Sequence, residues 1–482
     1  MKPEFDSERI ADSQHMEQQF ERKLDLKLIL SVIAAGLMSF TGVVVETALT
    51  VTFPTLMDQF GVDIATVQWI TTGYLLMLAV TIPLSSFLKK RFPMKHLFLF
   101  AVAVFIVATV TCMVAPSFSI LLLGRLLQGV GAGIALPLMF NIVLEQAPFD
   151  KMGFMMGIAS LIAAIAPAVG PSFGGLVAST LGWQMIFAFL LPLLLVSLLL
   201  GIYAIRQSSE TAHISFDRLG YLLLVVCFAC FVFAINSASS EGWASVRVVV
   251  LFLVCLASLF LFVRHEGVVE KPLIDLDVFR TSKFTFSVLY LILLQFICLG
   301  IGFLLPNYSQ LVMGENALTA GCILLPGCIV GAVLNPFTGR MLDSHGAALP
   351  IMIGMTCAVI STALFAIFIP VASTAALTGI YVFFAVAQGF TVGNIMTNGL
   401  RSLPNELNAD GNAVFSTFQQ LAGAVGTSAV STVVAAAQLS LPDDMVAGTR
   451  LGTSNAFMML LVLSLVMALC ACKAVLSRKT LS

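Results

Sequence analysis

Fourteen apolar runs, separated by short polar gaps, constrain this chain more than any other feature of its sequence. A helix needs about 20 apolar residues to cross a bilayer, and each run approaches or exceeds that length. Hydrophobic residues make up 59% of the 482 positions and charged residues only 10%, whereas soluble domains carry about 25% charged residues. The sequence therefore predicts an all-α polytopic membrane protein that crosses the bilayer over residues 28–55, 68–88, 97–114, 118–144, 154–179, 184–205, 219–237, 247–263, 284–307, 317–338, 348–370, 375–399, 412–437 and 454–473.

The distribution of lysine and arginine predicts the orientation of these helices. An even number of crossings places both chain ends on one side, and cytoplasmic loops carry an excess of Lys and Arg. With a cytoplasmic N-terminus, every Lys and Arg is cytoplasmic except Arg125, inside a span, and Arg247 and Arg450, outside. We therefore expect both termini to be cytoplasmic and the protein to reside in the plasma or inner membrane. The polar N-terminal residues read as a soluble tail and not as a signal peptide.

Two long polar connections divide the helices into groups. Residues 206–218 and 264–283 isolate the seventh and eighth helices from six before and six after. We therefore expect a tail (1–26), a six-helix bundle (27–205), two extra helices with their linkers (206–283), a second six-helix bundle (284–473) and a short tail (474–482). SSFLKKRFPMKHLF and TGRMLDSHGAAL occupy equivalent loops in the two bundles, which indicates an internal repeat of the kind found in transporters.

Two charged residues, Glu46 in VVVETALTV and Arg125 in LLLGRLLQG, are predicted to lie deep within spans. A charge there costs at least about 2.5–3.5 kcal/mol, so such residues point to function by default. Counting 1.5 Å per residue from the outer helix ends places Glu46 about 15 Å and Arg125 about 10 Å deep, which permits a direct or water-bridged pair. The proton affinity of a carboxyl changes when an arginine moves toward it or away from it, as proton coupling requires. The alternatives are a static ion pair and an arginine that only bonds backbone carbonyls.

Two glycine-rich segments are the most specific motifs. In LLLGRLLQGVGAG the glycines allow close helix approach, and no strand precedes them, which argues against a nucleotide-binding loop. In APAVGPSFGG, prolines interrupt backbone hydrogen bonding and bend the helix, so the bend is either fixed or moves during function. The G-x-S-x-G match within it lies on a helix, and no histidine lies in a span, which argues against a serine hydrolase. This second motif contains Ala166, Gly170, Pro171, Gly174 and Gly175.

Aromatic and uncharged polar residues in the spans are candidates for lining a substrate cavity. The alternative is hydrogen bonding between helices and, for Trp69, anchoring at the membrane interface. These residues are Trp69, Tyr74, Asn141, Gln295, Gln388, Asn394 and Asn398. All ten cysteines fall in apolar runs, so we read them, Cys227 and Cys230 of the C-x-x-C pair included, as packing residues and expect no metal site and no cofactor.

With these motifs in view, residues from about 30 to 436 resemble the major facilitator superfamily, and within it the fourteen-helix drug:proton antiporters of the EmrB/QacA type, lincomycin-resistance-like branch. LLLGRLLQGVGAG resembles the fourth-helix motif, whose arginine, here Arg125, is implicated in proton transfer. APAVGPSFGG resembles the fifth-helix antiporter motif, with Ala166 where glycine is usual. KPLIDLDVFR and LPNYSQLVMGENALTAGCILLPG are also similar to stretches of this branch. GRMLDSHG resembles the second copy of the family's loop motif, carried by Gly339, Asp343 and Gly346.

Two departures from the family's pattern are present. In the first copy of the loop motif, Lys90 and Pro93 replace the usual acidic residue and glycine, so the gating salt bridge ascribed to that loop is in doubt. Many relatives carry Asp one position before Glu46, at Val45, although the lincomycin-like branch resembles this chain in having Glu.

The resemblance and the two buried charges together predict a proton-driven antiporter that exports amphipathic or lipophilic compounds by alternating access. We expect it to work as a monomer, with protons, a small-molecule substrate and the bilayer as its partners and with no nucleic acid. It would not be an enzyme, and the proton gradient would replace any cofactor. The alternatives are an exporter of one endogenous metabolite, lipid or peptide, a proton-coupled importer and, from other classes, a membrane enzyme or a passive channel.

Overall fold

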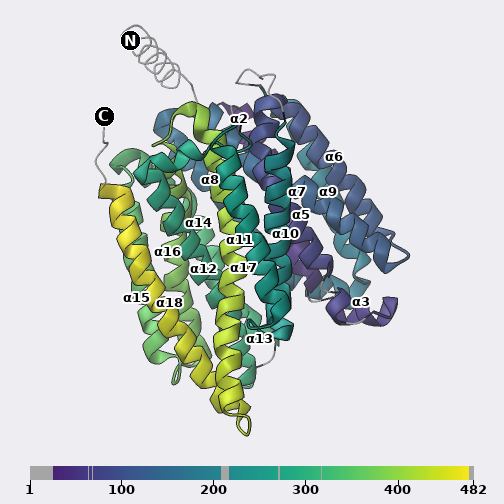
Figure 1. Ribbon diagram of the computed structural model, residues 1–482, viewed down its shortest axis with the longest axis vertical. Coiled ribbons are helices and arrows are strands. Elements are labelled where there is room, and N and C mark those ends of the chain that lie inside the picture. Colours follow the sequence, from purple (N-terminus) through teal and green to yellow (C-terminus); the bar gives the residue numbers. More distant parts are fainter. Residues whose placement is uncertain are drawn as a thin grey trace.

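The computed structural model describes residues 25–50, 52–62, 64–67, 69–207, 216–269, 272–315 and 317–476. Within them, fourteen helices are long and apolar enough to cross a membrane, as the sequence predicts, and they form one elongated bundle (Figure 1). These helices are α2 (Leu26–Thr50), α5 (Trp69–Arg91), α6 (Met94–Met113), α7 (Phe118–Gln146), α8 (Met152–Leu181), α9 (Gln184–Ala204), α10 (Arg218–Glu241), α11 (Val246–Glu266), α12 (Ser282–Leu311), α14 (Leu325–His345), α15 (Ala348–Phe368), α16 (Thr374–Leu400), α17 (Asn408–Ser440) and α18 (Met445–Leu476).

Two spans are shorter or more divided than the sequence suggests, and proline accounts for both. The first crossing, expected to reach residue 55, ends with α2 at Thr50, and a separate helix α3 (Phe53–Phe60) follows with proline in its first turn. The tenth, expected over 317–338, divides into α13 (Ala317–Cys322) and α14, which also begins with proline. Proline suits the first turn of a helix because it has no N–H to leave unbonded. Short elements α4 (Ile64–Val67), η1 (Phe149–Lys151), η2 (Leu276–Arg280) and η3 (Asn405–Leu407) complete the fold.

The helices pack in two sets that follow the same plan. In the first, α2 packs against α7, α8 and α9, and α7 also packs against α5 and α6. In the second, α12 packs against α16, α17 and α18, and α16 also packs against α14 and α15. We call α2–α9 the N-terminal half and α12–α18 the C-terminal half. The hairpin α10–α11 packs on α5 of one half and α17 of the other.

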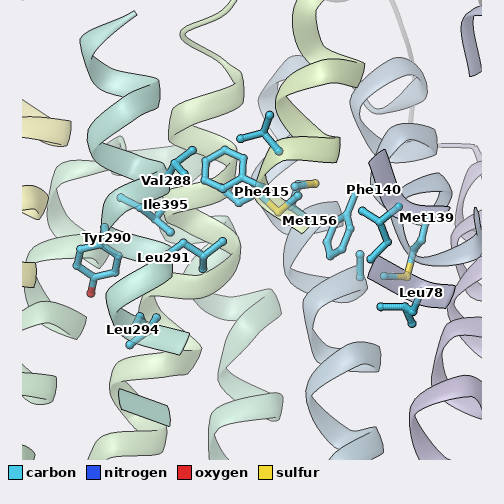
Figure 2. Close-up of a cluster of buried hydrophobic side chains, with 14 of the residues drawn as sticks. Leu78, Met139, Phe140, Met156, Val288, Tyr290, Leu291, Leu294, Ile395 and Phe415 are labelled. Atoms are coloured by element: carbon cyan, nitrogen blue, oxygen red, sulfur yellow. The ribbon is translucent and has the colours of Figure 1, made fainter. Parts of the chain in front are cut away.

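One apolar core runs through both halves. Figure 2 shows Leu78, Met139 and Met156 from the N-terminal half in the same cluster as Leu291 and Phe415 from the C-terminal half. A second, smaller cluster surrounds the end of α2 and includes Val44, Val45, Ala48, Leu49 and Trp183. The helix that carries Glu46 therefore ends inside its own apolar cluster.

The start of α2 and the end of α18 lie at the same end of the bundle (Figure 1), which we call the terminal face; the opposite end is the far face. The two halves approach most closely near the terminal face. A Cβ on Gly153, at the start of α8, would lie 2.5 Å from the carbonyl oxygen of Gly339 on α14. One turn further along α8, a Cβ on Gly157 would lie 2.4 Å from the carbonyl oxygen of Asn335. Backbone therefore meets backbone between the halves at this end.

The proposed division into tails and bundles stays a prediction. Most of the N-terminal tail (residues 1–24), the linker residues 208–215 and residues 477–482 lie outside the described residues. The C-terminal tail was expected from residue 474, whereas α18 continues to Leu476.

Candidate functional site

Arg125 is completely buried in α7 and is held by groups other than Glu46. Its Nε donates to the carbonyl oxygen of Ile70 at 3.2 Å, and its Nη1 donates to Oε1 of Gln128 at 2.8 Å. Its guanidinium carbon lies 4.2 Å from the centre of the Tyr74 ring. Its Nη2 has no hydrogen-bond partner. One donor of a buried cation is thus free to bind another group.

Gln128 connects Arg125 to a third helix. Its Nε2 donates to Oγ1 of Thr109 on α6 at 2.9 Å, and that hydroxyl donates to the carbonyl oxygen of Phe105 at 2.7 Å. Gln128 and Thr109 are both fully buried. The chain of bonds fixes the guanidinium in a low-dielectric interior, where satisfied polar networks are strong and specify one geometry.

Glu46 lies on α2 and is only partly buried. It is within electrostatic range of Arg125 and Tyr74, but no direct ion pair joins Glu46 to Arg125 in the described residues, since the bonded nitrogens of Arg125 have other partners. Because α2 ends four residues later at Thr50, Glu46 lies about 6 Å from the end of its helix. This is shorter than the 15 Å expected from a helix that continued to Leu56.

Tyr74 lies between the two charges. It is fully buried, its hydroxyl has no hydrogen-bond partner, and its ring faces Arg125. Its hydroxyl comes within 3.1 Å of where a Cβ on Gly42 would be, and Gly42 is one helical turn before Glu46. Tyr74 therefore fills the space between the helix of Glu46 and the arginine and does not line an open cavity in this conformation.

The glycines of the antiporter-like motif pack directly on the helix of Glu46. A Cβ on Gly170 would lie 1.7 Å from Oγ1 of Thr47, and a Cβ on Gly174 would lie 2.4 Å from the carbonyl oxygen of Ala48. Ala166 is fully buried in the cluster around the end of α2. Gly175 faces open space. The motif, which also includes Pro171, forms part of the continuous helix α8, so its small residues set how closely α8 approaches Glu46.

Most of the candidate cavity residues contact other groups of the protein in this conformation. Asn141 accepts a hydrogen bond from Asn412 at 2.8 Å, Asn394 donates to the carbonyl oxygen of Phe390 at 2.8 Å, and Asn398 donates to the carbonyl oxygen of Ala474 at 3.2 Å. The ring of Trp69 lies 5.0 Å from that of Phe233 on α10. Gln295 and Gln388 are partly buried. A cavity of about 390 Å³ lies elsewhere, lined by residues such as Pro370 and Arg450 near the far face. The cavity assignment stays a prediction.

The loop motif at the end of α14 joins the two halves. Asp343 accepts hydrogen bonds from the backbone N–H groups of Gly153 and Phe154, both at 2.9 Å, and pairs with Arg401 at 2.8 Å. Those N–H groups belong to the first turn of α8, where carboxylates are favoured because the first amides of a helix lack internal partners. Gly339 permits the close backbone approach described above, and Gly346, at φ 82°, ends α14.

Sequence reasoning missed two elements of this arrangement. Gln128 follows Arg125 by three residues in LLLGRLLQG, so its position on the same helical face was a usable signal. Asp410 was read as part of a polar gap, yet it is fully buried and pairs with Lys90 at 2.6 Å. The residue that departs from the family's loop motif thus forms a salt bridge of its own.

A separate polar cluster fixes the α10–α11 hairpin at the terminal face. Asp217 accepts from the N–H groups of Leu219 and Gly220 and lies 2.9 Å from Nε2 of His265. Burial opposes ionisation of this carboxyl, but its bonds to Gly220 and His265 prevail and lower the pKa of Asp217. Glu266 beside it accepts from the N–H of Leu273 at 2.8 Å. Asp217 thus caps the start of α10, and Glu266 binds the linker that follows α11.

Comparison with known families identifies the family to which this chain belongs. The model of the Major Facilitator Superfamily matches residues 32–427 of the chain. The chain belongs to the major facilitator superfamily. The match includes Glu46, Arg125 and the loop motif at Asp343, and confirms the resemblance seen in the motifs.

Named relatives within the superfamily cover most of the chain. The lincomycin resistance protein LmrB of Listeria monocytogenes is 37% identical over 453 residues, which are 92% of this chain and 96% of the relative. LmrB of Bacillus subtilis is 33% identical over 86% of each chain. A multidrug resistance protein B homolog of Mycobacterium tuberculosis is 27% identical over 87% of this chain and 78% of its own length.

Solved structures agree on the fold. The human organic anion transporter MFSD10 (TETRAN) superposes with a TM-score of 0.66 over 93% of this chain and 100% of its own, at 13% sequence identity. The proton:xylose symporter XylE gives a TM-score of 0.65 over 92% of this chain and 94% of its own, at 14% identity. Membership of the superfamily and a multi-pass, all-helical membrane fold are therefore established for this chain.

Proposed function

We propose that this protein is a proton-coupled antiporter that exports amphipathic or lipophilic compounds across the plasma membrane by alternating access. One observation carries the proposal: a carboxyl on α2 and a guanidinium on α7 lie within electrostatic range of each other inside the apolar bundle, yet no direct bond joins them. Ionisable residues within membrane spans mark proton or ion pathways in most transporters. No cofactor is required, because the proton gradient supplies the energy.

We place the terminal face in the cytoplasm. Lysines and arginines gather in the connections at this face, and the positive-inside rule assigns such connections to the cytoplasm. The contacts between halves, at Gly153, Gly157 and Asp343, lie near the same face. In this assignment the conformation is closed toward the cytoplasm, and the cycle proceeds by separating the halves there.

Nη2 of Arg125 and the hydroxyl of Tyr74 have no hydrogen-bond partner, so both are available to bind Glu46 during the proposed cycle. Ionised Glu46 attracts the arginine and the cationic group of a substrate, whereas protonation from the outside weakens both attractions. The neutral carboxyl then permits the return to the inward-facing state, where its proton is released. One proton crossing 100 mV supplies about 2.3 kcal/mol and one pH unit about 1.4 kcal/mol, which supports at least about a hundredfold accumulation of substrate.

The substrate class rests on the relatives. Proteins of about the same length that are named for lincomycin resistance are 33–37% identical to this chain, and a relative named for multidrug resistance is more distant. An apolar bundle with an acidic group on α2 suits amphipathic compounds, because binding sites for such ligands are mostly apolar with a few polar groups.

Transport into inverted membrane vesicles tests the proposal. With an imposed proton gradient, the native chain should accumulate a fluorescent lipophilic cation and lincomycin, and Glu46→Gln should abolish this driven uptake while leaving the protein level unchanged. Glu315→Gln is the matched control, because it removes the same charge from a carboxyl in the connection between α12 and α13, where it accepts a hydrogen bond from Thr374. Driven uptake by Glu46→Gln equal to that of the native chain would remove Glu46 from the mechanism.

A further inference from the structure

Lys90 and Asp410 form a contact between the halves that was not predicted from the sequence. Lys90 lies in the last turn of α5 in the N-terminal half, and Asp410 lies in the first turn of α17 in the C-terminal half. Their charged atoms, Nζ and Oδ2, are 2.6 Å apart, and the Ser86 hydroxyl donates to the other carboxylate oxygen. The side chain of Asp410 is fully buried, whereas that of Lys90 is 32% exposed.

This contact is the internal-repeat counterpart of the one at Asp343. The pair α5 and α17 occupies the same place in the fold as the pair α14 and α8, because each joins the second helix of one half to the fifth helix of the other. At Asp343, an acid at the end of the second helix meets the first turn of the fifth. At Lys90, a base at the end of the second helix meets an acid in the first turn of the fifth. The charge pattern is reversed between the two repeats.

The reversed arrangement suits the helices that carry it. An anion is favoured in the first turn of a helix and a cation in the last turn, and Asp410 and Lys90 occupy those positions. Neighbouring polar groups on α17 add to the contact, since Asn412 donates to the carbonyl oxygen of Pro137 at 2.9 Å and to Asn141. When the halves separate at the terminal face, water replaces each partner.

We propose that Lys90 and Asp410 form a latch of reversed polarity that holds the halves together at the terminal face and must break for that face to open. The latch replaces the salt bridge that the first loop motif would otherwise supply. The proposal rests on alternating access but not on proton coupling, so it can fail or stand apart from the role of Glu46.

Removing Lys90 and removing the charge of Asp410 should open the terminal face to different extents, and this difference tests the proposal. Without Lys90, the closed state retains a buried and unpaired carboxylate, and breaking a buried pair in this way is strongly destabilising. Without the charge of Asp410, Lys90 can turn its partly exposed amine to water. Lys90→Ala should therefore open the terminal face more than Asp410→Asn, and the double variant should resemble Asp410→Asn.

Hydrogen–deuterium exchange of the full chain in lipid nanodiscs measures this opening. Lys90→Ala should raise the exchange rate of amides at the start of α17 and of α8 at least about tenfold, given the cost of an unpaired buried charge. Lys90→Arg keeps the cation in the last turn of α5 and should retain slow exchange and transport. Lys89→Ala is the matched control: its partner Glu145 is 2.5 Å away, and both lie within the N-terminal half.

Equal exchange in Lys90→Ala and Lys89→Ala would overturn the latch, as would exchange in Lys90→Arg as fast as in Lys90→Ala while the variant remains folded by thermal unfolding. Exchange that responds as expected, together with proton-driven uptake that survives Glu46→Gln, would support the latch and reject the proposed proton site. The two proposals are thus separately refutable.

Discussion

Replacing Gly174 by alanine tests whether the close approach of α8 to α2 controls Glu46. The added Cβ would lie 2.4 Å from the carbonyl oxygen, 2.7 Å from Cα and 2.7 Å from Cβ of Ala48. Two of these atoms are backbone and cannot rotate away, so α8 and α2 have to separate by roughly 1 Å to reach ordinary contact distance. Ala48 follows Glu46 by two residues on α2, so the part of this separation that α2 takes up displaces the carboxyl relative to Arg125.

The size of the effect follows from two opposing contributions. Overpacking of this kind costs about 1–3 kcal/mol, and the rigid neighbours put Gly174→Ala at the upper end. Alanine is favoured over glycine in a helix by about 1 kcal/mol. We therefore expect a net loss of about 2 kcal/mol in the free energy of unfolding.

Gly175 provides the control on the same helix. A Cβ there meets nothing within 4 Å, so Gly175→Ala should retain only the propensity gain of up to about 1 kcal/mol. Denaturant unfolding of the purified protein and proton-driven uptake into inverted vesicles give the two readouts. We expect Gly174→Ala to lose stability and most of its transport and Gly175→Ala to lose neither. Indistinguishable behaviour of the two variants would refute the reasoning.

Two further predictions concern Gln128, which binds Arg125, and Asp217, in the separate polar cluster at the terminal face. Gln128→Leu removes the acceptor of Nη1 of Arg125, so it should lower the free energy of unfolding by about 1–3 kcal/mol and slow transport; unchanged unfolding and uptake would show that Ile70 and Tyr74 suffice to hold the guanidinium. Asp217 has a lowered pKa in the folded chain, so its stabilisation is present above its unfolded pKa and is lost as the pH falls through the lowered value. Asp217→Asn should therefore reduce the melting temperature at neutral pH and converge with the native chain in acid, and a pH-independent difference would contradict this.

The membrane fold and the location of Glu46 and Arg125 within helices long enough to cross a membrane could be predicted because they depend on local composition. Apolar runs and their polar gaps locate the fourteen spans whatever packs around them, and a charge within a run is visible without a structure. The errors at α2 and α14 arise where proline divides a continuous apolar run into two helices.

The contacts between halves could not be predicted, because they join residues far apart in the chain. Lys90 and Asp410 are 320 positions apart, and each looks ordinary in its own sequence context: one sits in a basic loop and the other in a polar gap. Their pairing depends on the packing of α5 against α17. Tyr74 is a similar case, since its aromatic ring and hydroxyl suggested a cavity, whereas the surrounding helices enclose it against Arg125.

The early end of α2 has an electrical consequence. In the proposed orientation, and with the end of α2 taken as the outer edge of a hydrocarbon layer about 30 Å thick, Glu46 lies about 6 Å inside that edge, so about one fifth of the membrane voltage would fall between the outer solution and this carboxyl. In the proposed cycle, a proton arriving from outside would therefore cross little of the field, and most of the voltage would act on its exit toward the cytoplasm. The inward release step, and not proton capture, would be the part of the cycle that responds most steeply to membrane potential.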